Sequence, residues 1–415
     1  MPNKNISRAR FINNKLLGRK RDVEEKTCIE EDIREIRPLT MQLSTETTQD
    51  RQEVVEVCED LYHLLKHEDI HLLKEFHRMY LDYSFTNNLP PQLKALDASQ
   101  PWLLYWIGNS LRLMNPKWLS KNYQQGISEK LLNASVNGGP FCGGLGQLPH
   151  LICNYAAVTA LALCDNYDDC WSKINVHGIY QWLLALKMPN GGFKTCLEVG
   201  ECDTRGTYCA LSVAAMLNIL TPELCTGVEE FLIKCQTYEG GFGGCPQEDE
   251  AHGGYTYCAV ASLAILGRLE VINVGSLMEW CSARQFNEER GFSGRSNKLV
   301  DGCYSYWVGG TAAILEAYGY GECIDKPMLR DYILKCCQTK ERPGLRDKPG
   351  KSPDFYHTNY VMLGLSITEH NFKVQGSVNS IKCAPIKESA EIVPINPVFG
   401  LPSEDLEKFV RFYSH

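Results

Sequence analysis

Three residues in the last third of the chain offer metal ligands of mixed chemistry. Asp301 and Cys303 stand two positions apart, and His357 follows 54 residues after the cysteine. A carboxylate, a thiolate and an imidazole together suit zinc, and three protein ligands leave a fourth position open, as in catalytic zinc sites. The alternative is a buried cysteine, an aspartate that caps a helix and an unrelated histidine. The residue types alone leave both interpretations open.

Positive charges and a phenol flank these ligands. Arg295, Lys298 and Tyr304 lie close to Asp301 in the sequence, and His252 lies about 50 residues earlier. Cations and hydroxyl donors stabilise negative charge that develops on a leaving group such as a diphosphate. A solvated charged loop over residues 295–298 is the structural alternative.

Aromatic residues that could line an apolar cavity are spread along the chain. They are Trp102, Trp106, Tyr208, Tyr255 and Trp307. Ligand cavities are lined mainly by apolar and aromatic side chains, with a few polar groups that fix the ligand. Ordinary core packing would use the same residues, so these positions also have two interpretations.

An internal repeat explains how such distant residues could meet. A glycine-rich turn, followed ten to fifteen residues later by an aromatic that opens a helix of small residues, occurs five times. The turn positions, 48 to 53 residues apart, are Leu145, Phe193, Phe242, Phe292 and Leu345. A helix that is apolar all round is buried, whereas the amphipathic segments 177–187 and 228–235 suit an outer layer. The pattern predicts an all-α fold, an α/α barrel built as a ring of helical hairpins, with 101–113 as an earlier inner helix.

The register of the repeat brings the chemical residues together. Arg205, Tyr304 and His357 each lie 12 residues after their turn position, and His252 lies 10 residues after its own. Equal offsets place side chains at equal heights in a ring of repeats. We therefore expect these residues at one end of the barrel, and this register favours the zinc interpretation.

Composition limits the class of protein. The chain has 415 residues and a formal net charge of −8, which argues against a general nucleic-acid-binding protein. No run of 18 apolar residues occurs, so no transmembrane helix is expected. The 19 cysteines are scattered without a C-x-x-C pair, and no secretory signal is present. We expect reduced thiols and a cytoplasmic location.

The N-terminal part differs from the rest. Residues 1–21 carry seven basic residues and no acidic one. We predict a disordered extension over 1–50, with an organelle transit peptide as the alternative, and a single barrel domain over 51–415. Within that domain, His63, His67 and His71 have a spacing that could place them on one helix face. We expect surface histidines there rather than a metal site.

Five longer motifs carry a resemblance to a known family. LDASQPWLLYW, CDTRGTYC, EAHGGYTYC, GRSNKLVDGCYSYW and DKPGKSPDFYHTNY closely resemble protein farnesyltransferase β subunits, and the likeness runs from about residue 60 to the C-terminus. The resemblance implies an α/α barrel, one catalytic Zn²⁺ per subunit and a heterodimer with a helical-repeat α subunit. It also implies transfer of a farnesyl group from farnesyl diphosphate to the cysteine of a C-terminal CaaX sequence.

Roles for individual residues follow from the same resemblance. The zinc ligands would be Asp301, Cys303 and His357; the diphosphate would meet His252, Arg295, Lys298 and Tyr304, together with a lysine of the α subunit. Lys298 and Tyr304 would also assist catalysis, and Asp347 would hold Mg²⁺ near the diphosphate. The isoprenoid and the CaaX peptide would contact Trp102, Trp106, His150, Glu201, Arg205, Tyr208, Tyr255, Cys258, Trp307 and Tyr356.

Two alternatives remain beside farnesyl transfer. Type I geranylgeranyltransferase β subunits are similar, but they have a small residue in place of Trp102 and a lysine in place of Asp347, so both positions favour farnesyl here. A non-catalytic helical scaffold that binds a prenyl group would not need the ligand set. The chain also departs from the family at Ile152 and Cys153, where Ala and Pro are usual, and this leaves the preferred last CaaX residue open.

Overall fold

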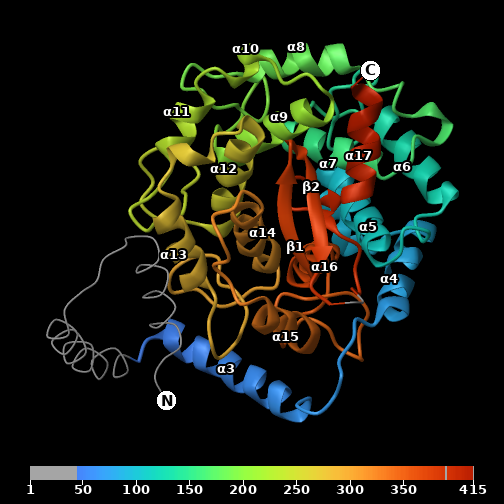
Figure 1. Cartoon of the computed structure of the whole chain (residues 1–415). Helices are drawn as coiled ribbons and strands as arrows, with labels where there is room; N and C mark the ends of the chain where they lie inside the picture. Colours follow the sequence, from blue (N-terminus) through green and yellow to red (C-terminus); the bar gives the residue numbers. More distant parts are fainter. Residues whose placement is uncertain (1–43, 388–389, 415) are drawn as a thin grey trace, which may run out of the picture.

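The computed structural model describes residues 44–387 and 390–414, and helices dominate these residues. Six inner helices form a ring (Figure 1). They are α5 (Gln100–Met114), α7 (Leu151–Ala162), α9 (Thr204–Met216), α12 (Gly253–Leu266), α14 (Tyr304–Ala317) and α16 (Phe355–Glu369). Each packs against the next, and α16 packs against α5, so the ring closes. The predicted α/α barrel is confirmed.

Outer helices alternate with the inner ones along the chain. They are α4 (Lys74–Thr86), α6 (Lys121–Asn133), α8 (Val176–Leu186), α10 (Pro222–Cys225), α11 (Val228–Ile233), α13 (Val274–Arg284) and α15 (Lys326–Cys336). Three short 3-10 helices, η1 (Pro91–Ser99), η2 (Tyr167–Asp169) and η3 (Leu269–Val271), lie in the connections. The amphipathic segments predicted as outer helices correspond to α8 and α11.

Small residues allow the inner helices to pack closely. In α16, a Cβ atom added to Gly364 would lie 2.3 Å from the Cβ of Ser305, next to the start of α14. Any larger residue at this position would force the two helices apart. The same small composition leaves almost every residue of α7 and α12 buried.

Capping side chains set the start of three inner helices. The Asp203 carboxylate accepts a hydrogen bond from the Arg205 backbone N–H at 2.8 Å, and the Asp354 carboxylate accepts one from the His357 N–H at 2.7 Å. Before α12, the Nδ1 atom of His252 accepts the Gly254 N–H at 3.0 Å. Capping satisfies backbone donors that the helix cannot pair. It also fixes where each first turn, which carries the predicted site residues, begins.

The C-terminal region closes one end of the ring. Tyrosine hydroxyls inside the barrel donate to backbone carbonyls of segment 397–400: Tyr105 to Gly400, Tyr155 to Phe399, Tyr208 to Val398, and Tyr257 to Pro397 and Val398. Val398 and Phe399 are fully buried. Segment 397–400 is therefore a plug that is hydrogen-bonded to the inner helices.

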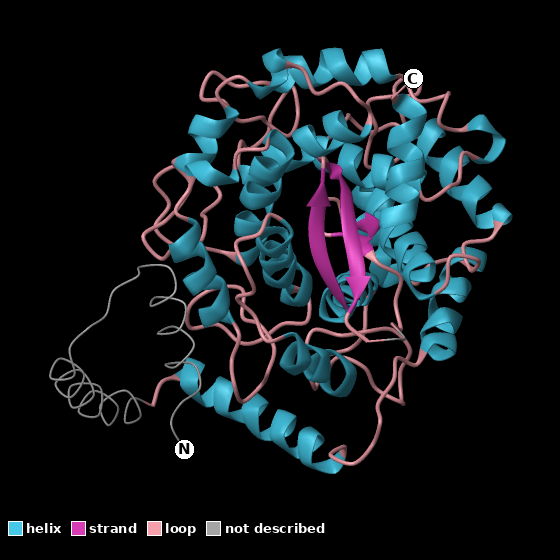
Figure 2. Cartoon of the chain, in the orientation of Figure 1, coloured by secondary structure: helices cyan, strands magenta, loops and turns pink. Residues whose placement is uncertain are grey.

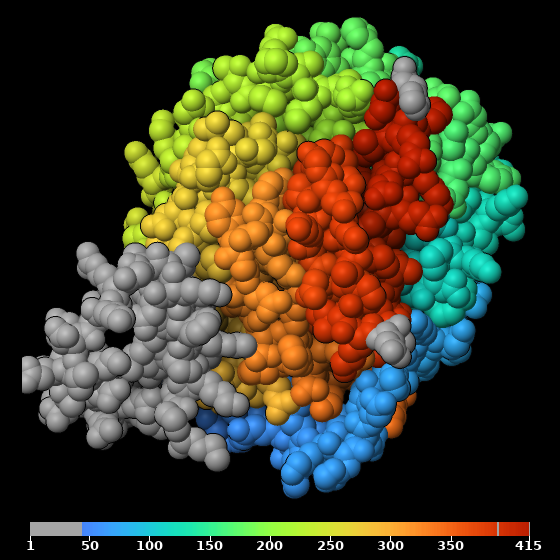
Figure 3. Space-filling view, viewed as in Figure 1, coloured from blue at the N-terminus to red at the C-terminus, as the bar shows by residue number. Residues whose placement is uncertain are grey.

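A β hairpin after the ring is the main feature that the sequence did not predict. Strands β1 (His370–Gln375) and β2 (Ser377–Pro385) pair antiparallel, and β3 (Ile395–Asn396) pairs with β4 (Leu401–Pro402). The hairpin lies across the ring in Figure 2, and together with α17 (Ser403–Tyr413) it covers this face in Figure 3. Lysines within both strands weaken the alternating apolar pattern that would have revealed them.

The N-terminal helix begins earlier than expected. Helix α3 (Glu46–Leu64) starts inside the segment predicted as an extension, while residues 1–43 lie outside the described part, as do the expectations placed on them. The shared helix face of the three histidines was wrong, because α3 ends at Leu64; His71 instead lies in a loop beside Asp69 and Glu391. Among the described helices, none has the length and apolarity needed to cross a membrane.

Candidate functional site

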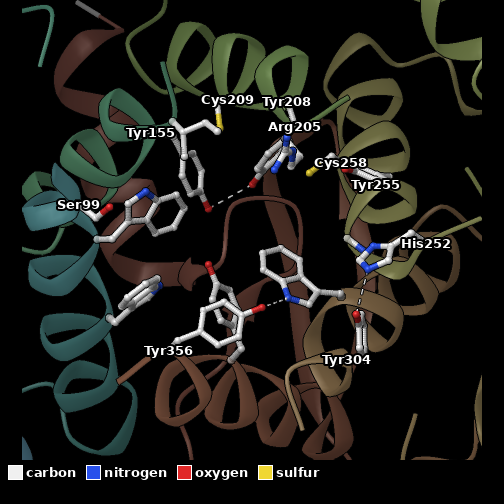
Figure 4. Close-up of a pocket in the computed structure, with 16 residues that line it drawn as sticks. Ser99, Tyr155, Arg205, Tyr208, Cys209, His252, Tyr255, Cys258, Tyr304 and Tyr356 are labelled. Atoms are coloured by element: carbon white, nitrogen blue, oxygen red, sulfur yellow. Dashed lines mark hydrogen bonds between the residues drawn. The ribbon is translucent and has the colours of Figure 1, made fainter. Parts of the chain in front are cut away.

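A cavity of about 440 Å³ lies inside the ring (Figure 4). Ten of the predicted site residues line it: Trp102, Trp106, Arg205, Tyr208, His252, Tyr255, Cys258, Tyr304, Trp307 and Tyr356. They come from α5, α9, α12, α14 and α16, or from the residue just before α12. The repeat register thus predicted correctly that residues far apart in sequence meet at one place.

Aromatic rings form most of the cavity wall. The Trp102 and Trp106 rings lie 5.5 Å apart between centroids, and Trp102 also lies 5.7 Å from Tyr155. The Trp307 indole donates a hydrogen bond to the Tyr356 hydroxyl at 2.9 Å. These contacts fix the side chains on the wall, so the cavity is preformed for an apolar ligand.

The three predicted metal ligands converge beside this cavity. Ligand atoms of Asp301, Cys303 and His357 all lie within 4.8 Å of one another, and in the described part of the chain no other cluster of this kind is found. The Nδ1 atom of His357 pairs with the Asp354 carboxylate at 2.7 Å. This contact turns Nε2 toward Asp301, at 3.2 Å. A carboxylate behind a histidine ligand is the usual arrangement around bound zinc.

Electrostatics at the cluster favours a cation. Burial disfavours the charged form of His357, but hydrogen bonds from Asp301 and Asp354 outweigh it and raise the pKa of His357 to about 10. Burial also opposes ionisation of Asp301, yet the hydrogen bond to His357 leaves its pKa below the usual value. Burial raises the pKa of the Cys303 thiol well above its ordinary value. Negative carboxylates thus surround a proton on His357 at the place where a metal ion would sit. An oxygen, a sulfur and a nitrogen donor at this spacing fit zinc.

A second pocket of about 360 Å³ adjoins the cluster. It is lined by Thr47, Asp50, His252, Gly294, Arg295, Asn297, Lys298, Leu299, Asp301, Tyr304 and Lys348. All four residues predicted to meet a diphosphate are among them. His252 and Tyr304 line both this pocket and the aromatic cavity, so one ligand with an apolar chain and an anionic head could span the two.

The hydrogen bonds of His252 determine how Tyr304 can act. Burial, followed by the positive charge of Arg295, lowers the pKa of His252, so the ring is neutral at pH 7. Its Nδ1 atom accepts the backbone N–H of Gly254, so the single ring proton is on Nε2. Nε2 lies 3.0 Å from the Tyr304 hydroxyl oxygen and donates to it. The Tyr304 proton is therefore free to point into the pocket, toward an anion.

A polar group lies at another part of the cavity mouth. Arg205 pairs with Asp203 at 2.6 Å and lies 3.6 Å from Glu201, and its guanidinium stacks over Tyr255 at 5.4 Å. Burial, followed by the charges of Glu201 and Arg205, perturbs His150 and leaves its pKa below the usual value. The buried Nδ1 atom of His150 has no protein partner. His150, Glu201 and Arg205 thus form one group, as predicted, although only Arg205 lines the cavity.

Asp347 is the predicted site residue that lines neither pocket. Its carboxylate pairs with Lys348 at 2.5 Å, and its other carboxylate oxygen is buried without a partner. Burial, followed by the charge of Asp301, raises the pKa of Asp347. Lys348, rather than Asp347, reaches the second pocket.

Several lining residues were missed in the sequence. Ser99, Ile152, Tyr155, Cys209 and Tyr360 line the aromatic cavity, although no role was predicted for any except Ile152, whose fit to the last CaaX residue was left open. Tyr155 and Tyr360 occupy the same repeat height as Tyr208 and Tyr306, which is a signal that could have found them. Asp354 stands three positions before His357, which is the spacing of a capping residue. Nothing in the local sequence marks Thr47 and Asp50.

Comparisons with known proteins agree with this geometry. A family model described as the prenyltransferase alpha-alpha toroid domain matches residues 72–401. The protein farnesyltransferase subunit beta of Saccharomyces cerevisiae is 58% identical over 99% of this chain and 97% of its own length. The subunit of the same name from Schizosaccharomyces pombe is 41% identical over 78% of this chain and 86% of its own.

A solved structure shows the same fold in a more distant relative. Candida albicans protein geranylgeranyltransferase-I complexed with GGPP superposes with a TM-score of 0.68, at 22% identity, over 82% of this chain and 98% of that chain. At this identity the likeness concerns the fold alone.

Proposed function

Because the chain belongs to the prenyltransferase family, and within it to the protein farnesyltransferase β subunits, we propose that it carries the active site of a zinc-dependent farnesyltransferase. The substrates would be farnesyl diphosphate and proteins that end in CaaX. In the reaction the cysteine sulfur bonds to C1 of the farnesyl chain, the C1–oxygen bond breaks, and the thiol proton and diphosphate are released. The enzyme would be a cytoplasmic heterodimer with a prenyltransferase α subunit.

One observation carries this proposal. The Asp301, Cys303 and His357 cluster adjoins a cationic pocket, and that pocket shares His252 and Tyr304 with an aromatic cavity. The three chemical parts that prenyl transfer to a thiol requires are therefore neighbours: a metal site, an anion site and an apolar site.

Asp301, Cys303 and His357 would hold Zn²⁺. When bound, the ion would lower the pKa of the substrate thiol, which is about 8.5 when free, and so supply a thiolate at neutral pH. Asp354 fixes the His357 ring by accepting from Nδ1, and Asp301 accepts the Cys303 backbone N–H at 2.8 Å. Both contacts hold the ligand side chains in place before any ligand arrives.

Arg295, Lys298 and Tyr304 would bind the diphosphate and stabilise the negative charge that grows on its bridging oxygen. The free Tyr304 proton is a suitable donor, because His252 already satisfies the hydroxyl oxygen from the other side. Preorganised donors lower the barrier most when they need no rearrangement during the reaction. The α subunit would add a lysine, and Mg²⁺ held by Asp347 would require Lys348 to leave that carboxylate.

The aromatic cavity would hold the farnesyl chain and the aliphatic residues of the peptide. Trp102 limits its depth, which favours a farnesyl group over the longer geranylgeranyl group. Arg205, with His150 and Glu201, would hold the peptide's terminal carboxylate region. Ile152 also lines the cavity, so its bulk bears on the last residue of CaaX.

A transfer assay tests the proposal. The chain is co-expressed with a prenyltransferase α subunit, and farnesyl and geranylgeranyl diphosphate are offered side by side with a CaaX peptide. We expect transfer with a preference for farnesyl. A preference for geranylgeranyl would assign the chain to the type I activity, and tight lipid binding without transfer would favour the scaffold alternative.

A further inference from the structure

Helix α3 is held against the loop that carries Arg295 and Lys298. The Arg51 guanidinium donates from Nε to Glu289 Oε1 at 2.9 Å and from Nη2 to Glu289 Oε2 at 3.1 Å. The same guanidinium lies 4.2 Å from the centroid of the Phe286 ring. The Glu289 side chain is fully buried. A buried carboxylate requires a charged partner, so this two-bond contact is strongly favoured.

A second contact anchors the far end of the helix to the same loop. The Tyr62 hydroxyl donates to the backbone carbonyl of Glu289 at 2.7 Å, and the Arg290 guanidinium stacks on the Tyr62 ring at 4.0 Å. Cys58, between these two anchors, is fully buried where α3 runs past α15 (Figure 1). Helix α3 therefore cannot shift along the barrel without breaking buried contacts.

The anchored helix reaches the cationic pocket with its first residues. Thr47 and Asp50 line that pocket together with Arg295, Lys298 and Lys348. Asp50 precedes Arg51, so the Arg51–Glu289 contact fixes the backbone that carries it. No site residue predicted from the sequence lies on α3, and an acidic residue here is unexpected, because a diphosphate would enter the same pocket.

Building on the proposed function, we propose that α3 forms a wall of the diphosphate pocket and that Asp50 limits the affinity of the pocket for diphosphate. A carboxylate near a bound polyanion repels it, whereas the surrounding cations attract it. The repulsion acts on substrate and on released diphosphate alike. Asp50 is thus a specificity-tuning residue that keeps the product from staying bound, and Arg51 is a positioning residue that holds it in place.

Neutralising Asp50 tests the inference directly. Asp50→Asn keeps the size of the side chain and removes its charge. In the complex with the α subunit, we expect the Kd for inorganic pyrophosphate, measured by titration calorimetry, to fall about three- to tenfold at low salt. The gain should shrink at 0.5 M salt, where exposed charges are screened. Asp60→Asn is the matched control, because Asp60 is an exposed acid on the same helix that does not line the pocket.

Loosening the helix gives the second arm. Arg51→Gln combined with Glu289→Gln replaces the ion pair by two amides, so no buried charge is left without a partner. In this background the effect of Asp50→Asn should drop below about twofold, because the helix no longer holds residue 50 at the pocket. A merely structural role for α3 would change the melting temperature but not this coupling.

The outcomes separate this inference from the proposed function. Wild-type complex that binds pyrophosphate, with Asp50→Asn binding it equally or more weakly, overturns the role of Asp50 alone. Wild-type complex that binds no pyrophosphate and transfers no prenyl group overturns both. An equal gain in Asp60→Asn would show a general charge effect and would also overturn the inference.

Discussion

The two ends of the barrel use the same repeat in different ways. At the closed end, four inner helices place a tyrosine at one height: Tyr155, Tyr208, Tyr257 and Tyr306. Their hydroxyls bond to plug carbonyls or to one another. At the open end, the residues at matching offsets differ from repeat to repeat, and they include Arg205, His252, Tyr304 and His357.

This difference separates what holds the barrel together from what it does. The closed end repeats one residue type whose hydrogen bonds are all made within the protein, so it contributes stability. The open end varies, and some of its buried polar atoms have no protein partner, such as His150 Nδ1 and an Asp347 carboxylate oxygen. Buried polar groups without partners are costly, and they are retained where a ligand completes them.

The largest contrast is expected at the ligand set. His357→Ala should remove bound zinc and lower farnesyl transfer about a thousandfold, because three ligands become two. Metal content by plasma emission and turnover in the transfer assay check this. His67→Ala, at an exposed histidine, is the matched control and should change neither quantity. Full activity in His357→Ala would contradict the assignment.

The next largest effect is a pH dependence of metal binding. In the metal-free protein the pKa of His357 is raised from 6.5 to about 10. Folded protein therefore binds a proton that unfolded protein loses above pH 6.5. This contribution to stability is complete below pH 6.5 and is lost as the pH rises through about 10.

Zinc must displace that proton, so its affinity should rise with pH across the same window, by up to about tenfold per unit. Competition with a chelator at pH 6.5, 7.5 and 8.5 measures this. Pyrophosphate affinity, measured in parallel, is the control for general effects of pH on the complex. A zinc affinity that is flat over the three values would show that His357 is not a ligand.

A pair of tyrosine variants compares the two ends directly. Tyr304→Phe removes a donor aimed at the leaving group, so turnover should fall about tenfold or more with an unchanged melting temperature. Tyr257→Phe leaves the plug carbonyls of Pro397 and Val398 unpaired, so unfolding should become easier by about 1–3 kcal/mol with turnover retained. Turnover and thermal unfolding of both variants provide the check. If the two variants changed the same quantity, the division between the ends would be wrong.

A smaller effect is expected in the depth of the lipid cavity. Trp102→Thr removes a large ring from the wall, so the preference should shift toward geranylgeranyl diphosphate by about tenfold. Competition between the two donors measures the shift. Trp171→Phe, at an indole outside the cavity lining, is the control. An unchanged preference would remove Trp102 from the account of specificity.

The repeat made most of the fold and the open-end site predictable. Turn positions about 50 residues apart placed Arg205, Tyr304 and His357 at one height, and the ring confirms that they lie around shared pockets. The hairpin 370–385 and the plug 397–400 have no repeat, and their backbone is fixed by long-range contacts that no local pattern reports. Thr47 and Asp50 were missed for the same reason, because only the packing of α3 on the 286–298 loop brings them to the pocket.

The central claim is that Asp301, Cys303 and His357 form a zinc centre at the open end, and X-ray absorption at the zinc edge tests it most directly. In the heterodimer with no peptide added, the account predicts one zinc per complex with a single sulfur neighbour at about 2.3 Å and otherwise oxygen or nitrogen. The sulfur signal should disappear in Cys303→Ser and persist in Cys245→Ser. A complex without zinc, or a zinc ion with several sulfur neighbours in wild type, would contradict the account.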